Sequence, residues 1–135
     1  QGHITSNACS VAQWASVGAL KEAEQDVVTM HKAFSKRRDL IVELMKEMPY
    51  ISFTEPKGAF YVWFNIENAL GKSWKGQSLT DDTTFCKVLL ESKYVALVPG
   101  SAFMADGNVR ISYSNSEEEI REGMRRFKEF LSELA

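Results

Sequence analysis

The sequence predicts an α+β domain in which helices cover a small three-stranded sheet, mixed or antiparallel. Two observations predict this fold class. Segments with helical periodicity and segments typical of strands follow one another in the order helix, long helix, strand, helix, strand, strand, helix. The chain has 135 residues, of which 44% are hydrophobic, so it can close a hydrophobic core without disulfide or metal cross-links.

Two helices are expected in the first part of the chain. Ser10 to Gln13 fits a capping box, which predicts a short helix that runs to about Leu20. A longer helix is expected from about Gln25 to Met48, because Pro49 cannot supply the next helical amide. Apolar residues recur in it every three or four positions and are expected to face the core: Val27, Met30, Phe34, Ile41, Leu44 and Met48.

The middle of the chain predicts a turn, a strand, a loop and a helix. Residues 59–66 (AFYVWFNI) are aromatic and β-branched, which favours a strand largely covered on both faces, after a turn at 56–58. Residues 69–79 contain two glycines and several polar residues, so we expect an exposed loop. Thr80 and the two aspartates after it favour the start of a helix that runs to about Lys93.

Two short strands and a helix are expected to complete the fold. The strands are residues 95–98 and 109–113, with turn residues between them. Ser116 to Glu119 is a second capping box, which places the start of the last helix. An apolar stripe follows along that helix: Ile120, Met124, Phe127, Leu131 and Leu134.

Composition argues against several kinds of partner. The formal net charge of -2 gives no electrostatic basis for binding nucleic acid or an anionic membrane. Cys9 and Cys86 lie far apart and outside any metal-ligand pattern, so we expect no metal site and a reducing compartment. No apolar run approaches the roughly 20 residues of a membrane helix. His31 is expected to be an ordinary surface residue of its helix.

Three segments, in this order and at these separations, carry a resemblance to a known family. They are TSNACSVAQWA at residues 5–15, PKGAFYVWFNI at 56–66 and VALVPGSAFMADGNVRISYS at 95–114. Together they resemble the C-terminal part of class I, fold-type I aminotransferases that depend on pyridoxal 5'-phosphate. The bacterial-type aspartate aminotransferase branch is the most similar, and the resemblance spans essentially the whole chain.

The resemblance implies a domain organisation and an activity. Residues 1–22 would be the edge of the large domain with its connecting helix, and residues 23–135 the C-terminal small domain. The complete enzyme would be a homodimer that transfers an amino group between an amino acid and a 2-oxo acid, with aspartate and 2-oxoglutarate as the first choice. Aromatic amino acids and alanine remain open as substrates. We expect a cytoplasmic enzyme, or an organellar one where the protein carries a transit peptide.

The resemblance also implies roles for particular residues. Arg110, in the VRISY run, would bind the α-carboxylate of the substrate, since a planar guanidinium matches the two oxygens of a carboxylate. Gly58 and Phe60 would lie at the mouth of the substrate site. Ser6 and Asn7 would help to order the cofactor phosphate in the active site of the neighbouring subunit.

Each of these residues also has a purely structural interpretation. Arg110 can pair with a nearby acid on its strand or remain solvated. Phe60 can be a core residue, which is the commoner position of a strand phenylalanine. Ser6 and Asn7 can form a turn and a helix cap.

The sequence departs from the family pattern at three positions. Ala8 replaces a proline that many relatives carry, and Met104 replaces a glycine, which puts the local loop geometry in doubt. Gly2 stands where the animal-type branch has an arginine for the distal carboxylate, so dicarboxylate specificity cannot come from that position.

The family's catalytic lysine, which forms the Schiff base with the cofactor, would lie before Gln1. Lys36 does not replace it, because Lys36 belongs to a helix and lacks the rest of the lysine motif. We therefore expect that this chain alone neither binds the cofactor tightly nor transaminates. The alternative is a stand-alone, non-catalytic α+β domain for interaction or ligand sensing, which a natural start at or near Gln1 would favour.

Overall fold

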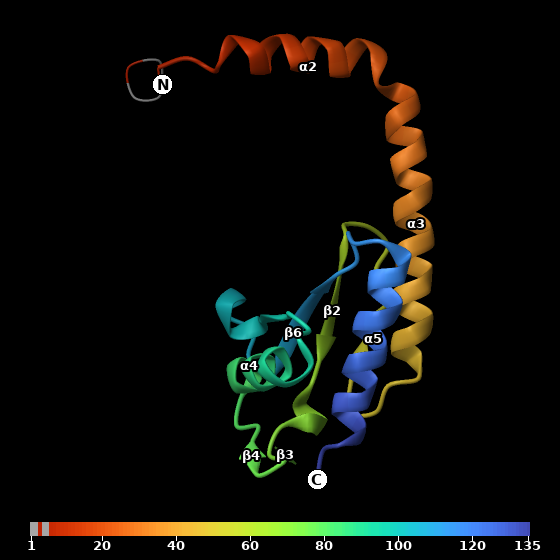
Figure 1. Ribbon diagram of the computed structural model, residues 1–135. Coiled ribbons are helices and arrows are strands. Elements are labelled where there is room, and N and C mark those ends of the chain that lie inside the picture. Colours follow the sequence, from red (N-terminus) through yellow and green to blue (C-terminus); the bar gives the residue numbers. More distant parts are fainter. Residues whose placement is uncertain (1–2, 4–5) are drawn as a thin grey trace. The chain divides into compact units, whose positions relative to one another are not determined.

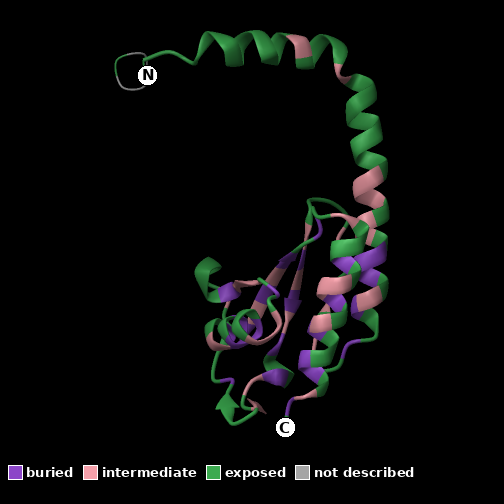
Figure 2. Ribbon diagram, viewed as in Figure 1, coloured by how far each residue is buried: buried purple, intermediate pink, exposed green. Residues whose placement is uncertain are grey.

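A computed structural model describes residue 3 and residues 6–135, which fall into two compact units, residues 1–33 and 34–135 (Figure 1). The first unit contains helix α2 (Ser10–Glu22) and the beginning of helix α3 (Glu24–Lys46). None of its described residues is buried (Figure 2). No described helix is both long enough and apolar enough to cross a bilayer. The predicted boundary after residue 22 stays a prediction.

Both helices of the first unit differ in detail from the prediction. The capping box at Ser10 is wrong: Cys9 is the N-cap residue of α2 and has no side-chain cap hydrogen bond. The side-chain amide of Gln13 donates instead to the carbonyl of Ala8 at 2.7 Å. Val27 and Met30, expected in the core, are 61% and 58% exposed, because the segment of α3 that carries them belongs to this unit without a buried residue.

The second unit confirms the α+β class, and its main sheet has one strand more than expected. Its main sheet has the order β1-β2-β6-β5, and every neighbouring pair is antiparallel. The strands are β1 (Ser52–Phe53), β2 (Tyr61–Asn65), β5 (Val98–Pro99) and β6 (Asn108–Ser112). The unpredicted strand is β1, which has only two residues and therefore carries no strand pattern of its own.

Residues 69–79 are not a simple exposed loop. They contain a second, two-stranded sheet made of β3 (Ser73–Trp74) and β4 (Gln77–Ser78), after the 3-10 helix η1 (Glu67–Ala69). Lys75 and Gly76 both have a positive φ, 47° and 86°, which is the backbone of a tight two-residue hairpin. Ala69 and Leu79, at the two ends of this segment, are fully buried.

The remaining helices begin near their predicted positions. Helix α4 (Asp82–Lys93) has Asp81 as its N-cap, whose carboxylate accepts from the amide of Thr84 at 2.7 Å. The capping box at the start of α5 (Glu117–Ser132) is confirmed, with Ser116 and Glu119 each accepting from the other's amide. The 3-10 helix η2 (Gly100–Phe103) lies between β5 and β6.

The core lies on one face of the main sheet. Val62, Phe64, Val109 and Ile111 alternate along β2 and β6 and are buried together with apolar residues of α4, α5 and the second part of α3 (Figure 2). Phe127 of α5 packs against Phe64 and Phe85, with ring centroids 5.9 Å and 6.2 Å apart. Because strand side chains alternate, the residues between the buried ones point to the opposite face. That opposite face carries the predicted substrate arginine.

Candidate functional site

On the opposite face of the sheet the β2 residues are half-buried, so β2 is fully buried on one face and partly covered on the other. The alternation of β2 and β6 brings polar and aromatic side chains together on this face: Tyr61, Trp63, Asn65, Asn108 and Arg110. Arg110 pairs in register with Trp63 on one side and with Val98 on the other. The central strand of the face therefore presents a guanidinium between aromatic neighbours.

Arg110 lies between two aromatic rings and has no acidic partner among the residues that the structure describes. Its Cζ atom is 4.9 Å from the ring centroid of Phe103 and 5.3 Å from that of Tyr61. No ion pair in the described part of the chain includes Arg110. The alternative in which Arg110 pairs with a nearby acid is thus absent among these residues. Arg110 can therefore bind an anionic ligand without first breaking an ion pair with a carboxylate of this part of the chain.

Phe103 reaches Arg110 because a buried hydrogen bond holds η2 beside α4. The carboxylate of Asp82, whose residue is 2% exposed, accepts from the backbone amide of Ser101 at 2.7 Å. A second hydrogen bond joins the hydroxyls of Thr83 and Ser101 at 3.3 Å. Met104 ends η2 in the left-handed region, at φ 58°. The turn at the end of η2 is therefore closed with methionine at this position.

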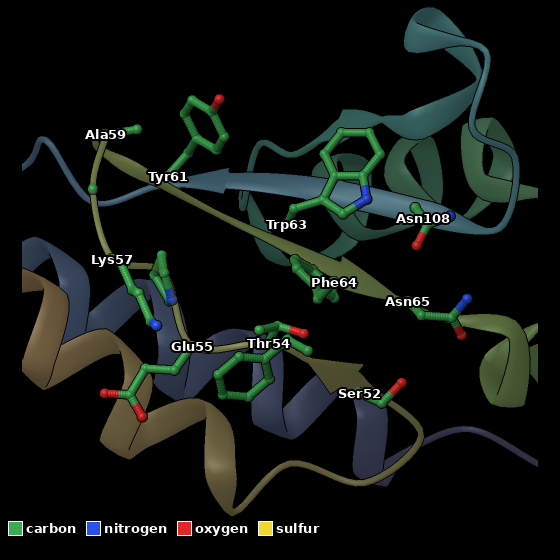
Figure 3. Close-up of a pocket in the computed structure, with 13 residues that line it drawn as sticks. Ser52, Thr54, Glu55, Lys57, Ala59, Tyr61, Trp63, Phe64, Asn65 and Asn108 are labelled. Atoms are coloured by element: carbon green, nitrogen blue, oxygen red, sulfur yellow. The ribbon is translucent and has the colours of Figure 1, made fainter.

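The loop before β2 forms one side of a groove of about 620 Å³ (Figure 3). Tyr61 and Trp63 line it along β2, and Ala59 lines it from the loop before that strand. Ser52, Thr54 and Glu55 face them from β1 and the following loop (Figure 3).

Gly58 and Phe60 belong to this loop. Gly58 is exposed, and the left-handed residue is its neighbour Ala59, at φ 62°. Phe60 is 52% exposed and packs edge to face on Tyr61 at 5.6 Å, so it is not a core residue.

Tyr113 fixes the shape of this loop. Its hydroxyl donates to the carbonyl of Ala59 at 2.9 Å, and its amide donates to the carbonyl of Phe60 at 2.8 Å. Burial raises the pKa of Tyr113, which keeps the hydroxyl protonated as a donor.

Tyr61, Trp63, Phe103 and Tyr113 belong to the site but were not predicted from the sequence. The alternation of side chains within AFYVWFNI places Tyr61 and Trp63 on one face of the strand. This pattern could have predicted that both residues belong to the site.

The expectation that the Schiff-base lysine of the cofactor lies before Gln1 stays a prediction. Lys36 is exposed on α3, as expected. Ser6 and Asn7 are exposed residues before α2 in the first unit, so their proposed contact with the cofactor stays a prediction. Gly2 lies outside the described residues.

The residues that the structure describes contain no group of three or more histidine, cysteine, aspartate or glutamate side chains able to hold a metal ion. Cys9 is exposed and Cys86 is buried, both as free thiols.

Several known proteins are similar to this chain in sequence and in fold. The chain is 40% identical to the aspartate/prephenate aminotransferase of Cereibacter sphaeroides over 136 residues, which cover all of this chain and 34% of that protein. It is 42% identical to the aspartate aminotransferase of Thermotoga maritima, covering 98% of this chain and 31% of that protein. The crystal structure of the aspartate aminotransferase of Rhizobium meliloti matches with a TM-score of 0.92 at 36% identity, covering 99% of this chain and 34% of that one.

The alanine aminotransferase of Pyrococcus furiosus has the same fold with a TM-score of 0.79, at 32% identity and covering 90% of this chain and 30% of that one. The chain thus spans about a third of the length of the relatives that it matches. The family described as aminotransferase class I and II matches residues 1–127. The chain belongs to the class I and II aminotransferase family.

Proposed function

We propose that this chain is the C-terminal part of a pyridoxal-phosphate-dependent aminotransferase and that Arg110 binds the α-carboxylate of its substrates. The observation that carries the proposal is the environment of Arg110: a half-buried guanidinium on the open sheet face, between aromatic rings, without an acidic partner in the described chain. A guanidinium offers parallel N–H donors in one plane, which match the two oxygens of a carboxylate. The two substrate classes, amino acids and 2-oxo acids, both carry that carboxylate.

The preferred substrates in this proposal are aspartate and 2-oxoglutarate. Support comes from the relatives, since the proteins of Cereibacter sphaeroides and Thermotoga maritima are both named for aspartate. The alanine aminotransferase of Pyrococcus furiosus is a matching structure at lower identity, so alanine should also be tested as a substrate.

The cofactor, in this proposal, is held mainly by residues outside the chain. It supplies the electron sink for transamination when bound. Arg110 contributes orientation, because fixing the carboxylate fixes how the rest of the substrate lies relative to the reacting centre. Gly58 and Phe60 border the substrate at the mouth of the site, and Ser6 and Asn7 approach the cofactor phosphate of a second subunit in a homodimer.

The first experiment establishes the coding sequence upstream of Gln1. An in-frame large domain with a Schiff-base lysine motif supports the proposal. A natural start at or near Gln1 would leave the family assignment in place and remove the catalytic proposal.

The second experiment measures transamination by the complete polypeptide with Arg110→Lys. Lysine keeps the charge and loses the planar pair of donors. We expect KM for the amino acid and for the oxo acid to rise about 10- to 100-fold, from the usual strength of hydrogen bonds to charged groups. Arg121→Lys, on the exposed side of α5, is the matched control and should leave both KM values unchanged. Unchanged KM values in Arg110→Lys would refute the assigned role.

A further inference from the structure

Arg110 is held by aromatic faces that come from two different segments of the chain. Tyr61 is on β2, the strand next to Arg110, and Phe103 is the last residue of η2. Trp63, directly opposite Arg110 in register, packs edge to face on Phe103 with the centroids 5.7 Å apart. Phe103 therefore lies against both Arg110 and the residue that Arg110 pairs with.

This arrangement restrains the guanidinium without occupying its hydrogen-bond donors. The two ring contacts involve no acceptor oxygen, and no described hydrogen bond or ion pair uses the side chain of Arg110, so its five N–H donors stay free for a ligand. A carboxylate partner would fix the side chain equally well but would occupy those donors. Aromatic restraint thus leaves an arginine that is already oriented and still able to bind an anion.

Hydrogen bonds of the residues on both sides of Phe103 fix its position in the turn. The buried Asp82 carboxylate holds the amide of Ser101, two residues before Phe103. The amide of Met104, the next residue, donates back to the carbonyl of Ser101 at 3.1 Å and closes the turn. Phe103 is nevertheless 45% exposed, so its ring does not serve mainly to fill the core.

We propose that Phe103 is a positioning residue for Arg110: its ring holds the guanidinium in the orientation that receives the carboxylate of the amino acid or oxo acid. The proposal rests on the carboxylate-binding role of Arg110 given above and extends it to the residue that orients this arginine. Phe103 does not touch the substrate in this account. Its effect is on carboxylate affinity, transmitted through Arg110.

The test replaces Phe103 in the complete polypeptide with leucine, with tyrosine and with phenylalanines carrying one, two and three fluorines. Fluorine withdraws charge from the ring face and weakens its attraction for a cation while the ring keeps nearly its size. Removing a cation–ring contact of ordinary strength should raise KM for both substrates about three- to tenfold. The inhibition constant of acetate, used as a simple carboxylate probe, should rise by the same factor, with kcat little changed.

The change in KM and in the acetate inhibition constant across the Phe103 variants tests the positioning role. A stepwise rise in KM and in the acetate inhibition constant with each fluorine, with Phe103→Tyr close to the wild type, is the expected result. Flat values across the fluorinated series and in Phe103→Leu, alongside a raised KM in Arg110→Lys, would overturn the positioning role and leave the proposed function intact. Flat values in Arg110→Lys as well would remove both. Met104→Leu, at the neighbouring residue that is 97% exposed, is the matched control and should leave both constants unchanged.

Discussion

Replacing Gly100 with alanine should destabilise the second unit strongly, because the space that a methyl group needs is filled by backbone. A Cβ atom at this position would lie 2.3 Å from the carbonyl oxygen of Ala105 and 2.6 Å from that of Asn108, both below the 3.0 Å limit of real Cβ contacts. Ala105 lies between η2 and β6, and Asn108 is the first residue of β6, so relief requires the backbone itself to move. Overpacking of this kind costs about 1–3 kcal/mol, and we expect about 3 kcal/mol here because no flexible side chain can yield.

Urea unfolding followed by circular dichroism measures this loss. With a slope of about 2 kcal/mol per molar urea, the midpoint should fall by about 1.5 M. Gly123→Ala is the matched control: nothing lies within 4 Å of a Cβ there, and the residue is inside helix α5. Its midpoint should rise, because alanine favours a helix interior over glycine by about 0.5–1 kcal/mol. Equal midpoints for Gly100→Ala and the wild type would refute the steric argument.

Three further results are expected. Met104→Gly should stabilise the chain by up to about 1 kcal/mol in urea unfolding, because Met104 has φ 58°, which glycine adopts without strain. Burial raises the pKa of the Cys86 thiol to about 12, so a thiol reagent at neutral pH should label exposed Cys9 and reach Cys86 only after unfolding. Hydrogen bonds led by that from Arg125 lower the pKa of Glu122 from 4.5 to about 2, which a carboxyl-carbon NMR titration should show.

The sign of the Glu122 effect follows from its lowered pKa. The stabilisation is fully present above pH 4.5 and is lost as the pH falls towards 2, and Arg125→Gln should move the titration back towards 4.5. A Glu122 midpoint near 4.5 in the unmodified chain would contradict the hydrogen bonds. Rapid labelling of Cys86 in the folded chain would contradict its burial. A lower urea midpoint in Met104→Gly would contradict the strain assigned to Met104.

Features written in a few neighbouring residues were predictable from the sequence. The capping box of α5 needs only Ser116 and Glu119, and the α5 apolar stripe is buried as its period predicts. At Ser10 the same pattern gave a wrong prediction, because helix α2 begins one residue earlier than the pattern implies and has Cys9 as its N-cap. A local pattern shows that a cap is possible, and the backbone decides which residue takes it.

Features that arise from pairing between distant residues were not predictable in the same way. Strand β1 exists because Ser52 and Phe53 pair with Asn65 and Phe64, and its two residues carry no pattern. The first part of α3 has the apolar period of a core-facing helix, yet Val27 and Met30 are exposed. Periodicity identifies the face that can be buried, but burial also requires a partner for that face.

At the candidate site, too, local sequence patterns predict one residue and distant contacts determine its surroundings, and the proposed role of Arg110 predicts a coupling between stability and binding. The family motif singled out Arg110, whereas its aromatic restraint depends on Phe103, a turn residue held in place by Asp82 from another helix. Gly100 begins that turn, so a displacement that relieves the clash in Gly100→Ala also moves Phe103 relative to Arg110. In the complete polypeptide Gly100→Ala should therefore raise KM for both substrates together with its loss of stability, whereas Gly123→Ala should change stability alone. An unchanged KM in a destabilised Gly100→Ala variant would mean that Arg110 keeps its orientation without the turn, and the coupling would be wrong.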